Sequence, residues 1–236
     1  MKILFFMTGH RQLEEYQIQK SIFEKFPDDI DHDLIVHSNS SIPASEIEKR
    51  LQGLRSLKKV CAQMPNKGYA TGHFHALKES YAMFTDYDYV IHLHPDVFVI
   101  DSSRLFSGVK VAFDWGFDFY LSYMLHVNTP SGLTETRNIN GREMNIYYHT
   151  DMFGFNPKSL TPNFFNINSN DCAEWLFTRA VSQSNKKVYH HERLRPVNSR
   201  MSFMTDERQT SPDSCDIWHS HDLAHLRNAL LLEKSE

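Results

Sequence analysis

The stretch Asp88-Tyr89-Val90-Ile91-His92-Leu93-His94-Pro95-Asp96-Val97-Phe98-Val99 lies near the middle of the 236-residue chain and interrupts an apolar run with a polar triplet. Its β-branched and aromatic side chains predict a buried strand over residues 89–100. Pro95 cannot donate a hydrogen bond to a neighbouring strand, so we expect the strand to break there. Asp96 would then stand at the rim of a sheet, either as a ligand for a divalent cation or as a solvated turn residue.

The residues before this stretch alternate between expected strands and expected helices. Strands are predicted at residues 2–7, 33–37 and 58–63, and helices at residues 12–26, 43–54 and 71–84. This alternation is typical of an α/β fold with a mostly parallel sheet and helices on both faces. Ligands of such sheets bind at the carboxyl ends of the strands, and the polar triplet would lie at one of these ends.

The second half of the sequence is less regular. Strands are expected at residues 117–127, 147–156 and 187–191, helices at residues 171–181 and after residue 222, and a loop at residues 128–145. No internal repeat and no long linker divides the chain, so we predict a single domain.

The composition excludes several classes of protein. The 25 basic and 29 acidic residues give a net charge of −4, which argues against a nucleic-acid-binding protein. The three cysteines are too scattered for a disulfide framework or a cysteine zinc site, which favours a reducing compartment. The apolar run at residues 3–7 is too short for a signal peptide or a membrane span, so we expect a soluble, cytoplasmic protein. The 14 histidines are unusually many and hint at a ligand.

The triplet His94-Pro95-Asp96 resembles the Asp-x-Asp motif of the GT-A class of nucleotide-sugar-dependent glycosyltransferases. In that class the motif follows a central strand and the last acid contacts a metal ion. The resemblance therefore implies a Rossmann-like GT-A fold and a metal ligand at Asp96, with Mn²⁺ or Mg²⁺ as cofactor. His94 replaces the first acid, and we assign it to the donor site while leaving its part in metal binding open.

The segment at residues 66–72 resembles the Asn-x-Gly segment that lies under the nucleotide in this class, although taken without this context an ordinary glycine turn is the more common explanation. A glycine turn before a helix exposes backbone N–H groups that can bind an anion. The residues implied for donor binding, besides His94, are Thr8, Gly9, Asn39, Asn66, Lys67 and Gly68.

Residues 148–157 resemble the strand that lines the acceptor side in this class, and residues 170–174 resemble the acidic helix start where inverting members keep their catalytic base. The resemblance implies Asp171 as the base, with Glu174 and Asp151 as alternatives. Acidic residues are also favoured at a helix start by capping alone.

Near the C-terminus, residues 216–222 include His219 and His221. Along a strand, these two side chains would point to the same face. Family members often use a C-terminal histidine as a further metal ligand, so both are candidates for the site of Asp96. The alternative is a polar turn that binds nothing.

The resemblance implies a glycosyltransferase that moves a hexosyl or pentosyl group from a UDP- or GDP-sugar to a glycan or another hydroxyl acceptor. We expect residues 1–101 to bind the nucleotide sugar and residues 102–236 to bind the acceptor, without nucleic acid or a membrane span. Two other functions stay open: a metal-dependent hydrolase or nucleotidyltransferase, and a non-catalytic sugar-nucleotide-binding domain.

Overall fold

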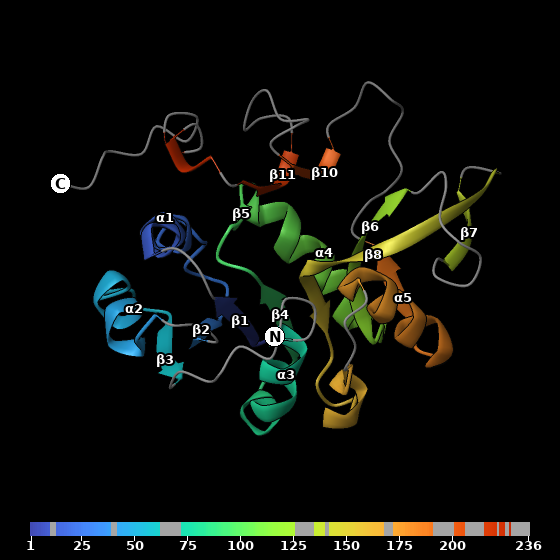
Figure 1. Ribbon diagram of the computed structural model, residues 1–236, viewed down its shortest axis with the longest axis horizontal. Coiled ribbons are helices and arrows are strands. Elements are labelled where there is room, and N and C mark those ends of the chain that lie inside the picture. Colours follow the sequence, from blue (N-terminus) through green and yellow to red (C-terminus); the bar gives the residue numbers. More distant parts are fainter. Residues whose placement is uncertain are drawn as a thin grey trace.

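The computed structural model of the chain describes residues 1–9, 13–38, 42–61, 72–125, 135–139, 142–167, 172–190, 201–205, 215–220, 222–224 and 227. Figure 1 shows these elements in their order along the chain. Among the described residues, no helix has the length and apolar character needed to cross a bilayer.

Strands and helices alternate through the first hundred residues, as the sequence predicts. The elements are β1 (Ile3–Gly9), α1 (Leu13–Phe23), β2 (His32–Ser38), α2 (Ala44–Arg50), β3 (Leu57–Cys61), α3 (Gly72–Glu79), η1 (Tyr81–Phe84), β4 (Tyr89–Leu93), β5 (Val97–Val99), α4 (Ser102–Asp114), β6 (Phe119–Leu125), β7 (Glu135–Ile139), β8 (Arg142–Phe155), η2 (Pro162–Phe165), α5 (Ala173–Gln183), β9 (Val188–His190), β10 (Met201–Thr205) and β11 (Cys215–His219).

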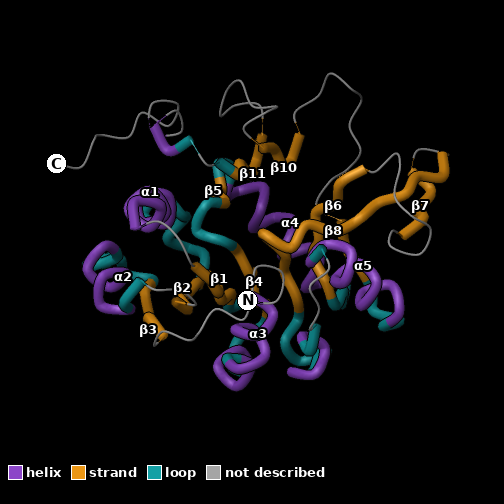
Figure 2. The backbone as a smooth tube through the Cα atoms, in the orientation of Figure 1, coloured by secondary structure: helices purple, strands orange, loops and turns teal. Residues whose placement is uncertain are grey.

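The main sheet has eight strands in the order β3-β2-β1-β4-β8-β6-β9, with β7 paired to β8. The pairs β1–β2, β2–β3, β1–β4 and β6–β9 are parallel, whereas β8 runs antiparallel to β4, β6 and β7. A second, smaller sheet joins β10, β11 and β5. Helices surround these strands (Figure 2), so the predicted mixed, mostly parallel α/β fold is confirmed.

Alternate side chains of β1 point into two different cores, because successive residues of a strand face opposite sides of the sheet. Ile3, Phe5 and Met7 pack with α1, α2 and α4 on one face. Leu4 and Phe6 pack with α3 and α5 on the other face. A strand that is buried on both faces reads as a continuous apolar run, which explains the run at the start of the sequence.

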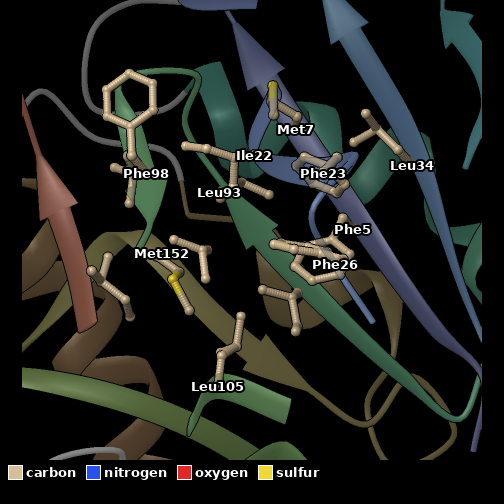
Figure 3. Packing of buried hydrophobic residues seen from close by; sticks show 14 of the residues in the cluster. Phe5, Met7, Ile22, Phe23, Phe26, Leu34, Leu93, Phe98, Leu105 and Met152 are labelled. Carbon is tan, nitrogen blue, oxygen red and sulfur yellow. The ribbon is translucent and has the colours of Figure 1, made fainter. Parts of the chain in front are cut away.

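Figure 3 shows the first of these cores from close by. The ring of Phe5 meets the ring of Phe23 edge-on, with centroids 5.0 Å apart, and the ring of Phe106 at 6.0 Å. These contacts join β1 to α1 and to α4. They pack the C-terminal part of α1 against β1 and α4.

In the second half, one expectation is wrong and one helix lies where no element was expected. Residues 128–145 are not a loop throughout, because β7 and the start of β8 pair there as an antiparallel hairpin, from Glu135 against Ile146 to Ile139 against Arg142. Cross-strand pairing thus overrides the polar composition that suggested a loop. Helix α4 was not predicted, although Asp101 caps it by accepting a hydrogen bond from the Arg104 backbone N–H, and its buried Leu105, Phe106, Val109 and Ala112 follow a helical spacing.

Candidate active site

The break at Pro95 takes the chain from one sheet to the other. Strand β4 belongs to the main sheet, whereas β5, which starts at Val97, pairs antiparallel with β11 of the small sheet. In this register His219 lies opposite Val97. The backbone N–H of Ser220 also donates to the carbonyl of Asp96 (3.0 Å). The pairing therefore brings His219 beside Asp96, although 123 residues separate them.

Two aspartates and two histidines meet at this junction, and each contact joins an aspartate to a histidine. The Nε2 atom of His219 lies 3.3 Å from Oδ2 of Asp96, and its Nδ1 atom lies 3.5 Å from Oδ2 of Asp151. The other oxygen of Asp151 lies 3.4 Å from Nδ1 of His94. All four side chains are between 16% and 20% exposed, so they can still reach a ligand. We call Asp96, His219, Asp151 and His94 the Asp-His cluster.

Asp151 enters the cluster from β8, next to β4. Its carbonyl accepts a hydrogen bond from the His94 backbone N–H (2.8 Å), which continues the β4–β8 pairing past the end of β4. The register between β6 and β8 shifts close by, between Leu121 and Tyr123 of β6. Such irregularities re-aim side chains. Asp151, one of three predicted bases, thus contacts the imidazoles of the candidate metal site.

Two buried histidines, His73 and His92, lie beside His94 of the cluster. The rings of His73, His92 and His94 have centroids between 5.2 and 5.4 Å apart. His92 is fully buried, and its Nε2 atom lies 2.9 Å from Oγ1 of Thr8. Burial holds the pKa of His92 well below its usual value, and the nearby His94 and His73 lower it further. His92 is therefore a neutral imidazole at neutral pH.

Of the predicted donor-binding residues, Thr8 and Gly9 end β1. The side chain of Thr8 is buried and contacts His92. A Cβ atom on Gly9 would stand only 1.7 Å from the Tyr16 hydroxyl oxygen and 2.8 Å from Pro95 Cγ. Gly9 is thus explained by the close packing of Tyr16 and Pro95 around it, which leaves its backbone at the strand end beside the His-Pro-Asp turn.

The predicted base Glu174 lies in the first turn of α5. The Thr150 hydroxyl donates to one of its carboxylate oxygens (3.4 Å) and the Cys172 thiol to the other (2.8 Å). Burial and this contact raise the pKa of the Cys172 thiol to about 11, so the thiol stays protonated and keeps donating. Thr150 directly precedes Asp151 on β8, but the Thr150 side chain contacts α5 whereas that of Asp151 contacts His94 and His219.

The remaining predictions lie outside the described residues. They concern Asn39, Asn66, Lys67 and Gly68 for the donor, Asp171 for the base and His221 for the metal.

The chemistry of the Asp-His cluster fits a divalent cation. Two neighbouring ligands of an octahedral ion at about 2.1 Å stand about 3 Å apart, close to the 3.3 Å between Asp96 and His219. Within the described part of the chain, no group of three or more His, Cys, Asp or Glu side chains is arranged so that it could hold a metal ion.

Sequence reasoning missed the residues that support the cluster. His73 was given no role, yet its ring stacks on His92 at 5.4 Å. Tyr16 and Gln19 of α1 were seen only as helix residues, yet both lie against the turn of Asp96. Tyr16 and Gln19 stand three residues apart and so share one face of the helix. This spacing could have marked them as a pair, but nothing in the sequence shows what that face contacts.

No known protein-family profile matches the sequence, and no curated protein matches it. Solved structures do match. The galactosyltransferase LgtC, solved with donor and acceptor sugar analogues, has a TM-score of 0.57 at 14% identity over 94% of this chain and 88% of its own. The mannosyltransferase PcManGT from Pyrobaculum calidifontis, solved with GDP-Man and Mn²⁺, has a TM-score of 0.52 at 13% identity over 80% of this chain.

The chain is shorter than some of these structures. It spans 54% of PcManGT and 58% of TarS from S. aureus, which it matches at 17% identity with a TM-score of 0.49. At these identities the likeness to LgtC and PcManGT shows the fold alone. Together with the strand order, it shows that this chain has the Rossmann-like GT-A fold.

Proposed function

We propose that the chain transfers a hexosyl or pentosyl group from a nucleoside-diphosphate sugar to a hydroxyl acceptor such as a glycan. The observation that supports this proposal is the Asp-His cluster, which places two carboxylates and two imidazoles at the carboxyl end of β4 in a GT-A sheet. The carboxyl edge of such a sheet is where nucleotides bind. The GDP-Man and Mn²⁺ in PcManGT agree with a UDP- or GDP-sugar donor and with a divalent cation.

Asp96 and His219 would hold Mn²⁺ or Mg²⁺, and His221 would be a further ligand. Bound there, the cation would neutralise the charge that develops on the diphosphate leaving group. Carboxylate and imidazole are suitable ligands for Mn²⁺-type ions. Asp151 contacts the imidazoles on both sides and so orients the ligand His219, as carboxylates commonly do for metal-bound histidines.

The donor and acceptor would approach from different strands. Residues 1–101 would bind the nucleotide sugar, with His94 of the cluster and Gly9 beside Pro95, and residues 102–236 would bind the acceptor. Because Asp151 is engaged with two histidines, we assign the catalytic base to the start of α5. There Glu174 is oriented by Thr150, and Asp171 directly precedes the helix in the sequence. A carboxylate at this place could take the proton of the acceptor hydroxyl.

The test is to identify the product released from the donor. The protein is incubated with a panel of UDP- and GDP-sugars, with and without Mn²⁺, and the nucleotides are separated by chromatography. We expect metal-dependent release of nucleoside diphosphate from one donor, and faster release once an acceptor is present. Release of nucleoside monophosphate would instead identify a hydrolase or nucleotidyltransferase. A thermal shift with a donor, but no turnover with any acceptor, would indicate a binding domain.

A further inference from the structure

One side chain of α1 bridges the backbone on both sides of Asp96. The amide nitrogen of Gln19 lies 2.8 Å from the carbonyl oxygen of Pro95 and 2.8 Å from that of Val97. Both N–H groups of the amide are thus used, one for each carbonyl. The reverse orientation would put the amide oxygen against two carbonyl oxygens, which repel it, so the hydrogen bonds define the orientation.

The bridge completes the hydrogen bonding of the His-Pro-Asp turn. The Val97 N–H donates to the carbonyl of His94 (3.1 Å) and closes the turn, and the Ser220 N–H donates to the carbonyl of Asp96 (3.0 Å). With the two bonds from Gln19, all four successive carbonyls from His94 to Val97 have a donor. The backbone that carries the Asp96 carboxylate therefore has little freedom to rotate.

Gln19 does this at a cost. Its side chain is fully buried, and its own amide oxygen has no hydrogen-bond partner among the described residues. A buried acceptor without a partner destabilises a fold, and an apolar side chain of similar size would avoid the penalty. An amide at this position therefore supplies the two hydrogen bonds to the turn, which an apolar side chain of the same size cannot make.

We propose that Gln19 is a positioning residue, whose amide holds the turn so that the Asp96 carboxylate faces His219 and the bound cation. This inference rests on the proposed metal site at Asp96. It gives helix α1 a part in metal and donor binding, although this helix would not contact the cation directly. Residues that orient metal ligands commonly change metal affinity by about 10–100-fold when they are replaced.

The test uses Gln19→Met, which keeps the length of the side chain and removes both donors. Its matched control is Ile47→Ala, a buried position of α2 in the same core, which lowers stability without touching the turn. The first measurement is amide hydrogen exchange at Val97 and Ser220. The second is the Kd for Mn²⁺ in the presence of UDP or GDP. We expect Gln19→Met to speed exchange at both amides and to weaken Mn²⁺ binding about 10–100-fold, whereas Ile47→Ala changes neither beyond its effect on global stability.

Wild-type protection of Val97 and Ser220 in Gln19→Met would overturn the proposal. So would an Mn²⁺ Kd within about twofold of wild type, if Asp96→Ala abolishes binding in the same assay. If instead Asp96→Ala leaves the Kd unchanged, the proposed metal site is wrong, while loss of protection in Gln19→Met would still support Gln19 as the holder of the turn. Should Gln19→Met fail to fold, Gln19→Glu keeps the length and offers at most one donor, so faster exchange is expected there too.

Discussion

The two ends of the same sheet carry very different chemistry. At the amino ends of β2 and β3 there is a cavity of about 610 Å³, whose walls include Phe23, Phe26 and the acidic Glu24, Asp28, Asp29 and Asp31. At the opposite end of the sheet, the Asp-His cluster brings together side chains from the His-Pro-Asp turn, β8 and β11. The amino end thus has a cavity, whereas the carboxyl end has a cluster of acids and imidazoles in contact with each other.

The difference shows that a hollow surface is weak evidence for function. Phe23 and Phe26 are almost fully buried, so the cavity at the amino end offers mainly exposed acids from the segment between α1 and β2. The ion pair between Asp28 and Arg55 there is more than 80% exposed on both sides. At the carboxyl end, acids and imidazoles from distant parts of the chain contact each other and are mostly shielded from water, which strengthens their interactions.

The largest expected effect is on turnover, which should respond very differently to the same substitution at the two ends of the sheet. Asp96→Asn removes the charge at the candidate metal site and should lower metal-dependent turnover by roughly 100-fold or more, since a ligand is lost. Asp28→Asn makes the same chemical change at the amino end and should keep turnover within about twofold. Initial rates at saturating donor and Mn²⁺ measure both. Equal losses in the two variants would contradict the assignment of the active site to the carboxyl end.

A second comparison concerns stability. The carboxylate of Asp216 is fully buried, and Nη1 of Arg104 lies 3.0 Å from it, which ties β11 to α4. Arg104→Gln leaves this charge without its guanidinium and should cost about 2–4 kcal/mol of unfolding free energy. Arg55→Gln breaks the exposed pair with Asp28 and should cost less than about 1 kcal/mol. Urea unfolding at pH 7 distinguishes them, and similar midpoints for both variants would show that the pair on β11 is not a structural tie.

A third comparison concerns pH, because two buried histidines near the carboxyl ends of β2 and β4 should make the stability of the fold depend on it. Burial lowers the pKa of His92 and of His37 below the usual 6.5, so the folded state resists protonation more than the unfolded chain does. The unfolding free energy should therefore be highest above about pH 6.5 and fall on acidification, by up to about 1.4 kcal/mol per pH unit for each histidine. Thermal melts between pH 5 and 8 measure this slope. His92→Gln should flatten it, and an unchanged slope would assign the acid sensitivity to other groups.

Several features were predictable because they depend on local pattern. The continuous apolar run of β1, the helical spacing in α1 and the break at Pro95 are each visible within about ten residues. The same logic failed for the hairpin of β7 and β8, whose polar residues become strands only because they pair with each other. Candidate site residues were recognised by chemical type, and Asp96, Asp151, His94 and His219 do meet, although their roles stay predictions.

The sequence by itself determined the α/β class, the interrupted central strand and the identity of the acids and histidines that could serve a metal–diphosphate site. The tertiary structure alone decided which of them are neighbours. It pairs β5 with β11, so that His219 reaches Asp96, and it lays Gln19 of α1 across the turn between β4 and β5. The physical reason is that strand order and register are set by packing between segments 70–120 residues apart, and no local periodicity encodes those contacts.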